Sequence, residues 1–376
     1  MNLLRSASRL SASLLLILLL GLVPLCGAMA QTLRYDVTSD GRVDVGDVEA
    51  LARLIVQQKQ NVTISTATTT PTGKTPIRIL DIGNSFSADA NCYLDGMVKA
   101  SGADASNVAL YQLFKSGSSF NYWVQNYKGN KTDNYTYYKV MGGLDVPIDG
   151  KNQINATDKS LFLKVLTEVR WDIIIIHQSS LACYKYESWN TANSADGDLP
   201  GFLSLLREHQ PQARIDFLLV HAPYQIIAKA KVQNSDQLWT KIMQSARKVQ
   251  QNDGIGRIIP AGTAVQNLRQ TKYNDAHELC RDDLHLGHGL ARYAANCAYY
   301  QTVIAPITGV SVLGNTYRPT ITSQDKKEST ASAPIPLTDD NALVAQTSAF
   351  LATVIGWKTF NPNDYLNVFM SADAFH

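Results

Sequence analysis

The sequence predicts an α/β protein built on a parallel sheet with helices on both faces. Two observations carry this prediction. Short, nearly continuous runs of Ile, Leu and Val recur along the chain, which is the composition of parallel strands whose two faces both lie in the core. The segments between these runs are long enough for a crossover helix. We therefore expect a flavodoxin-like three-layer sandwich with about five parallel strands.

The apolar runs give the five strands in chain order. Their sequences are IRILDI, VALYQLF, DIIIIH, RIDFLLV and GRIIPA, at residues 77–82, 108–114, 172–177, 214–220 and 256–261. Residues 126–160 are polar and rich in Tyr, Asn and Gly, which predicts a surface insertion between the second and third strands. Residues 314–340 predict a loop excursion, and residues 341–357 predict a final helix packed on the sheet.

The first 30 residues have the three-part pattern of a secretory signal peptide. Arg5 and Arg9 precede an apolar run at residues 14–25, and the small-residue motif Ala-Met-Ala at 28–30 supplies the cleavage site. A membrane anchor is the alternative, but the apolar run is shorter than the roughly 20 residues that span a bilayer. We therefore expect cleavage after Ala30 and a mature protein that is secreted, periplasmic or at the cell surface.

The charge balance excludes some function classes. The formal net charge is +2, and the two arginines of the leader account for it, so the mature chain is formally neutral. A nucleic-acid binder needs a basic face for phosphates, and adhesion to an anionic membrane by charge also needs an excess of cations. Neutrality argues against a nucleic-acid binder and against adhesion to an anionic membrane by charge alone. We also expect no membrane span after cleavage of the leader, because no other stretch of the chain could span a bilayer.

Four cysteines remain in the mature chain, and their pairing stays open. Their spacings contain no CxxC pair, which argues against a structural zinc site, and four cysteines allow three complete disulfide pairings. One disulfide bridge or free buried thiols are both compatible with export. The four residues are Cys92, Cys183, Cys280 and Cys297.

Residues 36–47 (DVTSDGRVDVGD) have the ligand pattern of an EF-hand-type calcium loop. Oxygen-bearing residues stand at the alternating ligand positions, Gly41 stands where the loop must turn sharply, and one residue would contribute its backbone carbonyl. The alternative is a solvated acidic turn before a helix. The predicted calcium ligands are Asp36, Thr38, Asp40, Arg42 (through its carbonyl), Asp44 and Asp47.

A single loop of this kind, followed by one helix, resembles one half of a dockerin repeat. The resemblance implies structural calcium and a possible cohesin-like partner. It also gives the expected domain organisation: a dockerin-like repeat at residues 31–56, a Thr-rich linker at 57–76 and the α/β domain at 77–376.

Three residues of the α/β domain have the chemistry of a serine nucleophile with its base. Ser85 follows the first strand at its carboxyl edge, where parallel sheets bind ligands. Asp282 lies three residues before His285 near the end of the domain, so one loop can supply both a proton acceptor and the carboxylate that orients it. A plain helix cap is the alternative for Ser85.

The blocks GNSFS at 83–87 and DDLH at 282–285 resemble those of the SGNH (GDSL-type) hydrolase superfamily. The resemblance implies a serine hydrolase in which Ser85 is the nucleophile, His285 the base and Asp282 the orienting carboxylate. It also implies an oxyanion hole made by the N–H groups of Ser85 and Gly117. The Asn of the family's third block is missing from IIIIHQSS, and Gln178 is expected in its place.

Several neighbouring residues compete for these roles. Ser87 is the second hydroxyl of the first block, and Asp283 is the second carboxylate beside His285. His288 lies one helical turn beyond His285, so Asp282, His285 and His288 together are an alternative metal site. The other strand-end histidines are expected to be structural, with His221 a candidate to line the pocket.

The sequence therefore predicts a secreted serine esterase that works through an acyl-enzyme, and the resemblance favours a carbohydrate O-acetyl esterase acting on an acetylated glycan. Calcium would be structural, and catalysis would need no cofactor. A lipase or phospholipid esterase of the same fold is one alternative, and a non-catalytic glycan-binding or assembly protein is another. Aromatic residues that could stack on sugar rings, or belong to the core, are Tyr122, Trp123, Tyr184, Tyr186 and Trp189.

Overall fold

The computed structural model describes residues 75–129, 135–156, 160–192 and 194–353. The predicted signal peptide, the calcium loop at 36–47 and the linker up to residue 74 lie outside these described residues. Within them, no helix combines the length and the apolar character needed to cross a membrane.

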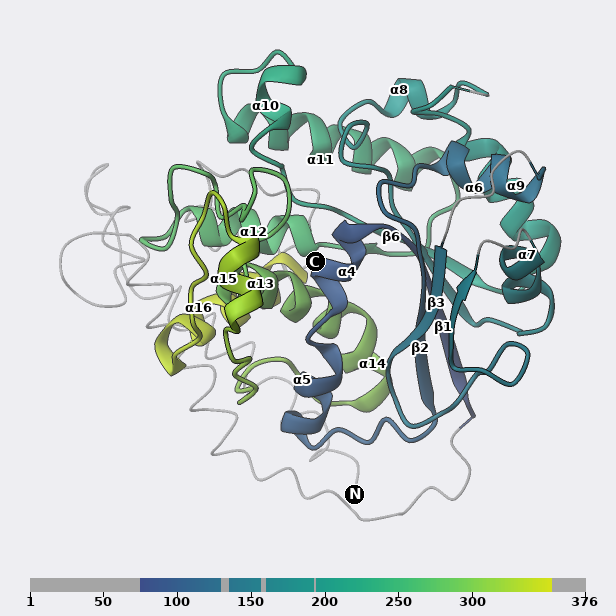
Figure 1. The fold of residues 1–376 in the computed structure, drawn as a ribbon, viewed down its shortest axis with the longest axis horizontal. Helices are drawn as coiled ribbons and strands as arrows, with labels where there is room; N and C mark the ends of the chain where they lie inside the picture. Colours follow the sequence, from purple (N-terminus) through teal and green to yellow (C-terminus); the bar gives the residue numbers. More distant parts are fainter. Residues whose placement is uncertain (1–74, 130–134, 157–159, 193, 354–376) are drawn as a thin grey trace, which may run out of the picture. The chain divides into compact units, whose positions relative to one another are not determined.

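The described residues form an α/β sandwich, as predicted, but its single sheet has seven strands rather than about five (Figure 1). The strand order is β4-β3-β2-β1-β5-β6-β7. The five predicted strands are all present and parallel to one another, and their order along the sheet is that of flavodoxin-like folds. These strands are β1 (Ile77–Gly83), β2 (Val108–Phe114), β5 (Ile173–Ile176), β6 (Arg214–Leu218) and β7 (Ile258–Ile259).

The centre of the sheet is held together by β1 and β5. Ile79 pairs with Ile173 and Ile82 with Ile176, and all four isoleucines of β5 are buried. Fully burying one such side chain contributes roughly 1.5–3 kcal/mol, so this strand pair anchors the fold. Burial on both faces explains why these strands are visible in the sequence as unbroken apolar runs.

Two described segments of the predicted surface insertion at 126–160 instead extend the sheet. Residues 135–141 form β3 (Tyr135–Met141), which pairs antiparallel with β2, and β4 (Gln153–Ala156) follows as the edge strand. Tyr135, Tyr137 and Met141 point into the core while the residues between them are partly exposed. This alternation gives a half-buried strand, and the tyrosines make it look polar in the sequence.

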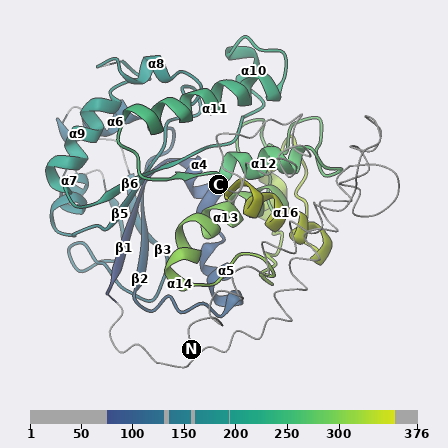
Figure 2. The ribbon, with the colours of Figure 1, turned by 180° about the vertical axis from the view of Figure 1, so that it is seen from behind.

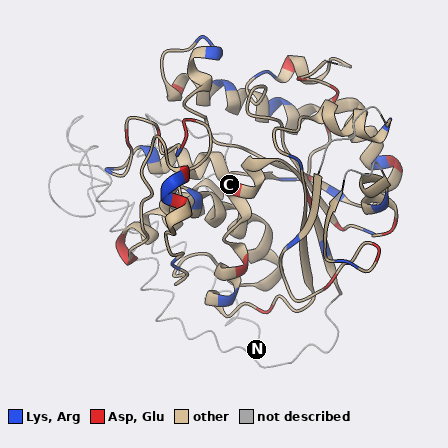
Figure 3. Cartoon of the chain, viewed as in Figure 1, with Lys and Arg blue, Asp and Glu red and all other residues tan. Residues whose placement is uncertain are grey.

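Charged side chains of both signs are interspersed over the described elements in Figure 3.

Helices cover the two faces of the sheet in two groups (Figures 1 and 2). The first group contains α4 (Ser85–Asn91), α5 (Leu94–Ser101), α12 (Ala261–Arg269) and α13 (Leu290–Tyr299), which runs through a π-helical turn (Tyr300–Ile304) into α14 (Ala305–Thr308). The second contains α6 (Phe120–Tyr127), α7 (Ser160–Thr167), α8 (Tyr186–Trp189), α9 (Leu199–His209), α10 (Ile226–Lys229) and α11 (Ser235–Asn252). The short helix α15 (Ser323–Glu328) lies farther from the sheet, where Asp325 contacts His288.

The predicted final helix is present as α16 (Asp339–Leu351), but it does not pack where we expected. It lies against α13 and α12 and so forms an additional layer outside the helices that cover the sheet. A capping box between Thr338 and Asn341 starts it, because each side chain bonds the other residue's backbone N–H. The preceding excursion at 314–340 is a loop that contains the short helix α15.

The order of the strands fixes where a ligand can bind. The chain leaves β1 toward β2 on one side, and later adds β5 on the other side of β1. Such a switch in direction opens a crevice at the carboxyl ends of the two central strands. Ser85 lies at this edge, directly after β1.

Candidate active site

The turn between β1 and α4 presents the hydroxyl of Ser85. Asn84, not Ser85, caps the helix: its backbone is extended, and its side-chain oxygen accepts a hydrogen bond from the N–H of Phe86 at 2.9 Å. Ser85 is the first residue of the helix and is partly exposed. Its hydroxyl is therefore not used as the helix cap.

Asp282 and His285 stand on a short hairpin at residues 279–287. Cys280 and Leu286 face each other as an isolated antiparallel bridge, and the N–H of Arg281 donates to the carbonyl of His285 at 2.8 Å. Asp283 at the tip has a positive φ of 64°, which closes the turn. The hairpin therefore holds the two predicted residues on one side of a tight loop.

The structure brings the three predicted catalytic residues together. The Oγ of Ser85 lies 2.8 Å from Nε2 of His285, and Nδ1 of His285 lies 2.7 Å from Oδ2 of Asp282. An ionised carboxylate can only accept a hydrogen bond, so Nδ1 carries the proton and Nε2 is left to accept one from the serine hydroxyl. This is the tautomer that a general base for Ser85 requires.

The carboxylate of Asp282 is held in its charged form. Its Oδ1 accepts hydrogen bonds from the backbone N–H groups of His285 at 2.7 Å and Leu284 at 3.1 Å. Partial burial acts to raise the pKa of Asp282, but these bonds and the imidazole of His285 hold that pKa below its ordinary value. The side chains of His285 and Asp282 are 20% and 34% exposed, so the group lies at the surface within reach of a substrate.

Ser87 and Asp283, the alternatives for the nucleophile and for the orienting carboxylate, are hydrogen-bonded to other residues. Ser87 is fully buried, where its hydroxyl donates to the carbonyl of Asn84 and accepts from the side chain of Gln112. Asp283 points to the other side of the hairpin and lies 2.7 Å from Nδ1 of His277. Neither residue contacts His285 through a hydrogen bond in the structure.

The alternative metal site is not assembled. His285 uses one ring nitrogen for each of its two partners, and His288 lies between Asp325 and Glu328 of α15, at 2.8 Å and 3.2 Å. Across the described residues, no three His, Cys, Asp or Glu side chains gather into a metal-binding group.

The two remaining oxyanion predictions have different outcomes. Gly117, with a φ of 67°, sits in an exposed turn that is bonded to the turn before Ser85: the carbonyl of Ser118 accepts from Asn84, and its hydroxyl donates to Gly83. Gly117 thus lies beside the nucleophile's turn, and its role as an oxyanion donor stays a prediction.

The expectation for Gln178 is not supported. Its buried amide donates to the carbonyl of Asp196 at 3.0 Å, and its side-chain oxygen accepts from the N–H of Ser179 at 2.8 Å. These bonds hold the loop after β5, so we do not place Gln178 in the oxyanion hole.

His177 supports the turn of Ser85 from β5, a structural role of the kind expected for the strand-end histidines. Its Nδ1 donates to the carbonyl of Gln178 at 3.0 Å, and its Nε2 accepts from the N–H of Asn84 at 3.3 Å. Burial lowers the pKa of His177 to about 4, so the ring is neutral and the tautomer is fixed by these two bonds. A Cβ on Gly83 would meet the ring at 2.3 Å, so this glycine lets the imidazole support the turn that carries Ser85.

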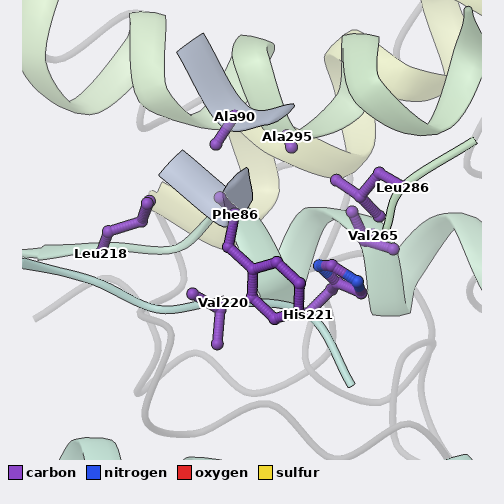
Figure 4. Close-up of a pocket in the computed structure, with 9 residues that line it drawn as sticks. Phe86, Ala90, Leu218, Val220, His221, Val265, Leu286 and Ala295 are labelled. Atoms are coloured by element: carbon purple, nitrogen blue, oxygen red, sulfur yellow. The ribbon is translucent and has the colours of Figure 1, made fainter. Parts of the chain in front are cut away.

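His221, a predicted pocket residue, lines a small apolar cavity behind α4 (Figure 4). Its ring packs on Phe86 with centroids 4.6 Å apart, and its Nε2–H donates to the carbonyl of Leu284 at 2.8 Å. Burial lowers the pKa of His221 to about 3, so this ring too is neutral. His221 therefore supports the hairpin tip from below.

The aromatic residues proposed for sugar stacking belong mainly to the core. Four of the five are buried, and Tyr184 packs partly against the same core. The large exposed aromatic residue near the site is instead Tyr224, 38% exposed, whose ring lies against His277 and whose neighbour Gln225 donates to the carbonyl of Asp283. The four cysteines of the described part of the chain are free thiols.

The comparisons with known proteins give the family. A family model described as a domain of unknown function, DUF4886, matches residues 78–334. The chain belongs to the DUF4886 family. The match runs from β1 past α15 and so contains the whole Ser85–His285–Asp282 group.

Solved structures include a relative of the same family. A DUF4886 family protein from Bacteroides uniformis ATCC 8492 is 26% identical, with a TM-score of 0.58 over 77% of this chain and 99% of that one. A gut microbial diltiazem-metabolizing enzyme is 14% identical with a TM-score of 0.30, over 63% of this chain and 48% of its own. No curated protein matches the chain.

Proposed function

We propose that this DUF4886 family protein is a serine hydrolase that cleaves an ester through an acyl-enzyme. One observation carries the proposal: the hydroxyl of Ser85, the imidazole of His285 and the carboxylate of Asp282 form a continuous chain of hydrogen bonds of 2.8 and 2.7 Å. The residues come from segments about 200 positions apart, and the partly exposed hydroxyl lies at the ligand-binding edge of the sheet.

The reaction follows from this geometry. Ser85 attacks the ester carbonyl as Nε2 of His285 takes the hydroxyl proton, and the resulting imidazolium is stabilised by Asp282. The tetrahedral intermediate then expels the alcohol, which receives the proton from His285. A water molecule repeats the same steps on the acyl-enzyme, releases the acid and restores Ser85.

The oxyanion would be stabilised by backbone donors. The N–H of Ser85 lies at the first position of α4, where helix N–H groups lack an intrahelical acceptor. The N–H of Gly117 in the neighbouring turn is the second proposed donor. Losing one such donor typically costs about 10²–10³ in rate.

We extend the proposal to the SGNH superfamily and to acetylated carbohydrate as the substrate. The order of the catalytic residues supports the first part, since the serine follows the first strand and the Asp-x-x-His hairpin precedes α13. The partly exposed triad and the exposed Tyr224, positioned beside the hairpin tip, support a polar substrate with a small acyl group.

Hydrolysis of p-nitrophenyl esters of increasing chain length tests this function. The wild-type chain should cleave the acetate faster than the laurate, and Ser85→Ala should lower kcat by about 10⁴-fold or more. Ser87→Ala is the matched control, because it removes the neighbouring hydroxyl that does not contact His285. Preference for the laurate would favour a lipase, and equal rates for wild type and Ser85→Ala would exclude the serine mechanism.

Calcium binding by residues 36–47 and export directed by residues 1–30 also stay proposals, resting on the sequence. Calorimetric titration of the whole chain with calcium tests the first. We expect one site in the wild type and none in a variant with both Asp40→Ala and Asp44→Ala, whereas equal heats from the two proteins would exclude the loop as the site. Hydrolysis should be nearly unchanged by a chelator, because the ions proposed here are structural.

A further inference from the structure

Asp89 is a buried carboxylate on the same helix as the proposed nucleophile. It follows Ser85 by four residues on α4, and residues at this spacing lie on one face of a helix. Its side chain is 2% exposed, whereas Ser85 is partly exposed at the start of the helix. A carboxylate removed from water in this way needs strong partners nearby.

The partners of Asp89 come from the distant end of the domain. Both of its oxygens lie 3.1 Å from Nη1 of Arg281, and Oδ2 accepts the backbone N–H of Leu286 at 2.9 Å. Its Oδ1 also accepts from Nε of Arg292, at the start of α13, at 2.9 Å. The same Nη1 of Arg281 donates to the carbonyl of Leu286 at 2.6 Å, which closes the cluster.

These contacts fall at both ends of the segment that carries the base. Arg281 directly precedes Asp282, and Leu286 directly follows His285. The carboxylate of Asp89 thus holds the hairpin on each side of the two residues that the reaction needs. The hairpin tip has a separate support from His221.

We propose that Asp89 is a positioning residue, which ties the helix of Ser85 to the hairpin of His285 and so sets the distance between hydroxyl and imidazole. This inference rests on the proposed function for its catalytic meaning. The tie is made between charged groups: burial acts to raise the pKa of Asp89, but Arg292 and Arg281 hold it below its ordinary value. A displacement of reacting groups by about 1 Å can cost about 10²-fold in rate.

The substitution Asp89→Asn tests the tie, with Asp216→Asn as the matched control. Asn keeps the size and removes the charge that balances two guanidinium groups. Asp216 is equally buried and is bonded by the guanidinium of Arg214, but it lies in β6 and contacts no residue of the hairpin in the described bonds. We expect Asp89→Asn to lower kcat for p-nitrophenyl acetate about 10²-fold with KM changed less than about threefold, and Asp216→Asn to change kcat less than about threefold.

A double variant separates positioning from general loss of structure. If Asp89 acts through His285, Asp89→Asn should slow the His285→Ala enzyme by less than about threefold, because the group that it positions is already gone. A further 10²-fold loss in the double variant would overturn the inference.

An NMR signal of His285 tests the link between Asp89 and the hairpin without measuring hydrolysis. In a chain with ¹³C-labelled histidine, the ring Cε1–H cross-peak of His285 is assigned by its loss in His285→Ala. We expect this peak to move in Asp89→Asn and to stay in place in Asp216→Asn. If the wild type cleaves no ester, the proposed function fails, and this signal still decides whether Asp89 positions the imidazole: an unmoved peak in folded Asp89→Asn overturns it.

If Asp89→Asn does not fold, Arg281→Lys is the second test of whether Asp89 positions His285. Lysine keeps the charge but lacks the planar group that reaches both the carboxylate and the carbonyl of Leu286. We expect it to shift the His285 peak and to lower kcat about 10-fold. An unmoved peak and an unchanged kcat in this variant would equally overturn the inference.

Discussion

Two pairs of neighbours show how position alone separates a reactive side chain from a structural one. Ser85 and Ser87 are two residues apart, yet the first meets His285 and the second is bonded inside the core. Asp282 and Asp283 are adjacent, yet the left-handed backbone at Asp283 turns its carboxylate toward His277. In each pair the residue types are the same, so the difference in expected chemistry comes from the bonds that each side chain makes.

The aspartate pair gives a prediction at this scale. Asp282→Asn should lower kcat for p-nitrophenyl acetate by about 10⁴-fold, the typical cost when the orienting carboxylate of a Ser-His-Asp group becomes an amide. Asp283→Asn should change kcat less than about threefold, because Asn tolerates the positive φ and the carboxylate does not touch His285. Steady-state kinetics with thermal unfolding as the check on folding distinguishes them, and similar losses in both variants would contradict the assignment.

At the scale of elements, the sequence predicts best what is buried on both faces. The five parallel strands are predictable because each contains an unbroken apolar run, such as residues 173–176, that can be identified from the local sequence alone. The strands β3 and β4 were missed because alternating tyrosines with polar neighbours resemble a surface loop. The place of α16 was also missed, since an apolar helix face does not say whether a sheet or another helix covers it.

The candidate site was predictable to the extent that it depends on short motifs. The GNSFS and DDLH blocks led to Ser85, Asp282 and His285, which lie together. The bonds of Gln178 are not predictable from the sequence, because strand alternation stops where β5 ends and the direction of a side chain in the following loop depends on bonds that no local pattern shows. The contacts of Asp89 join residues almost 200 positions apart and have no local signature either.

At the scale of the whole molecule, two buried aspartates on the same side of the sheet differ in charge compensation. Asp89 has two arginines, which lower its pKa. Asp81 in β1 has neutral donors, Tyr299 at 3.1 Å and Asn91 at 3.3 Å, and its Oδ1 has no hydrogen-bond partner. Burial therefore raises the pKa of Asp81 to about 7, which makes it a proton-binding group of the folded state.

This raised pKa predicts how stability depends on pH. In the folded state the carboxyl of Asp81 keeps its proton up to about pH 7, whereas in the unfolded chain it loses the proton near pH 3.8. The contribution of Asp81 to the free energy of unfolding is therefore constant below pH 3.8 and becomes unfavourable as the pH rises toward 7. The free energy of unfolding should fall by up to about 1.4 kcal/mol per pH unit in this window. Asp81→Asn should remove this part of the decline, so that the variant gains stability relative to wild type as the pH rises from about 4 to about 7.

Urea unfolding at several pH values measures the effect. Tryptophan fluorescence reports on this domain, since Trp171 and Trp239 are buried in its core. Parallel pH curves for the wild type and Asp81→Asn would contradict the proposed proton binding by Asp81.

Covalent labelling tests directly whether Ser85 is a nucleophile activated by His285. The full chain is treated with a fluorophosphonate, and the modified residue is found by mass spectrometry of its peptides. We expect one adduct per chain at Ser85, none in Ser85→Ala, and labelling at least about 10²-fold slower in His285→Ala. An adduct that persists in Ser85→Ala, or no adduct on the folded wild type, would contradict it.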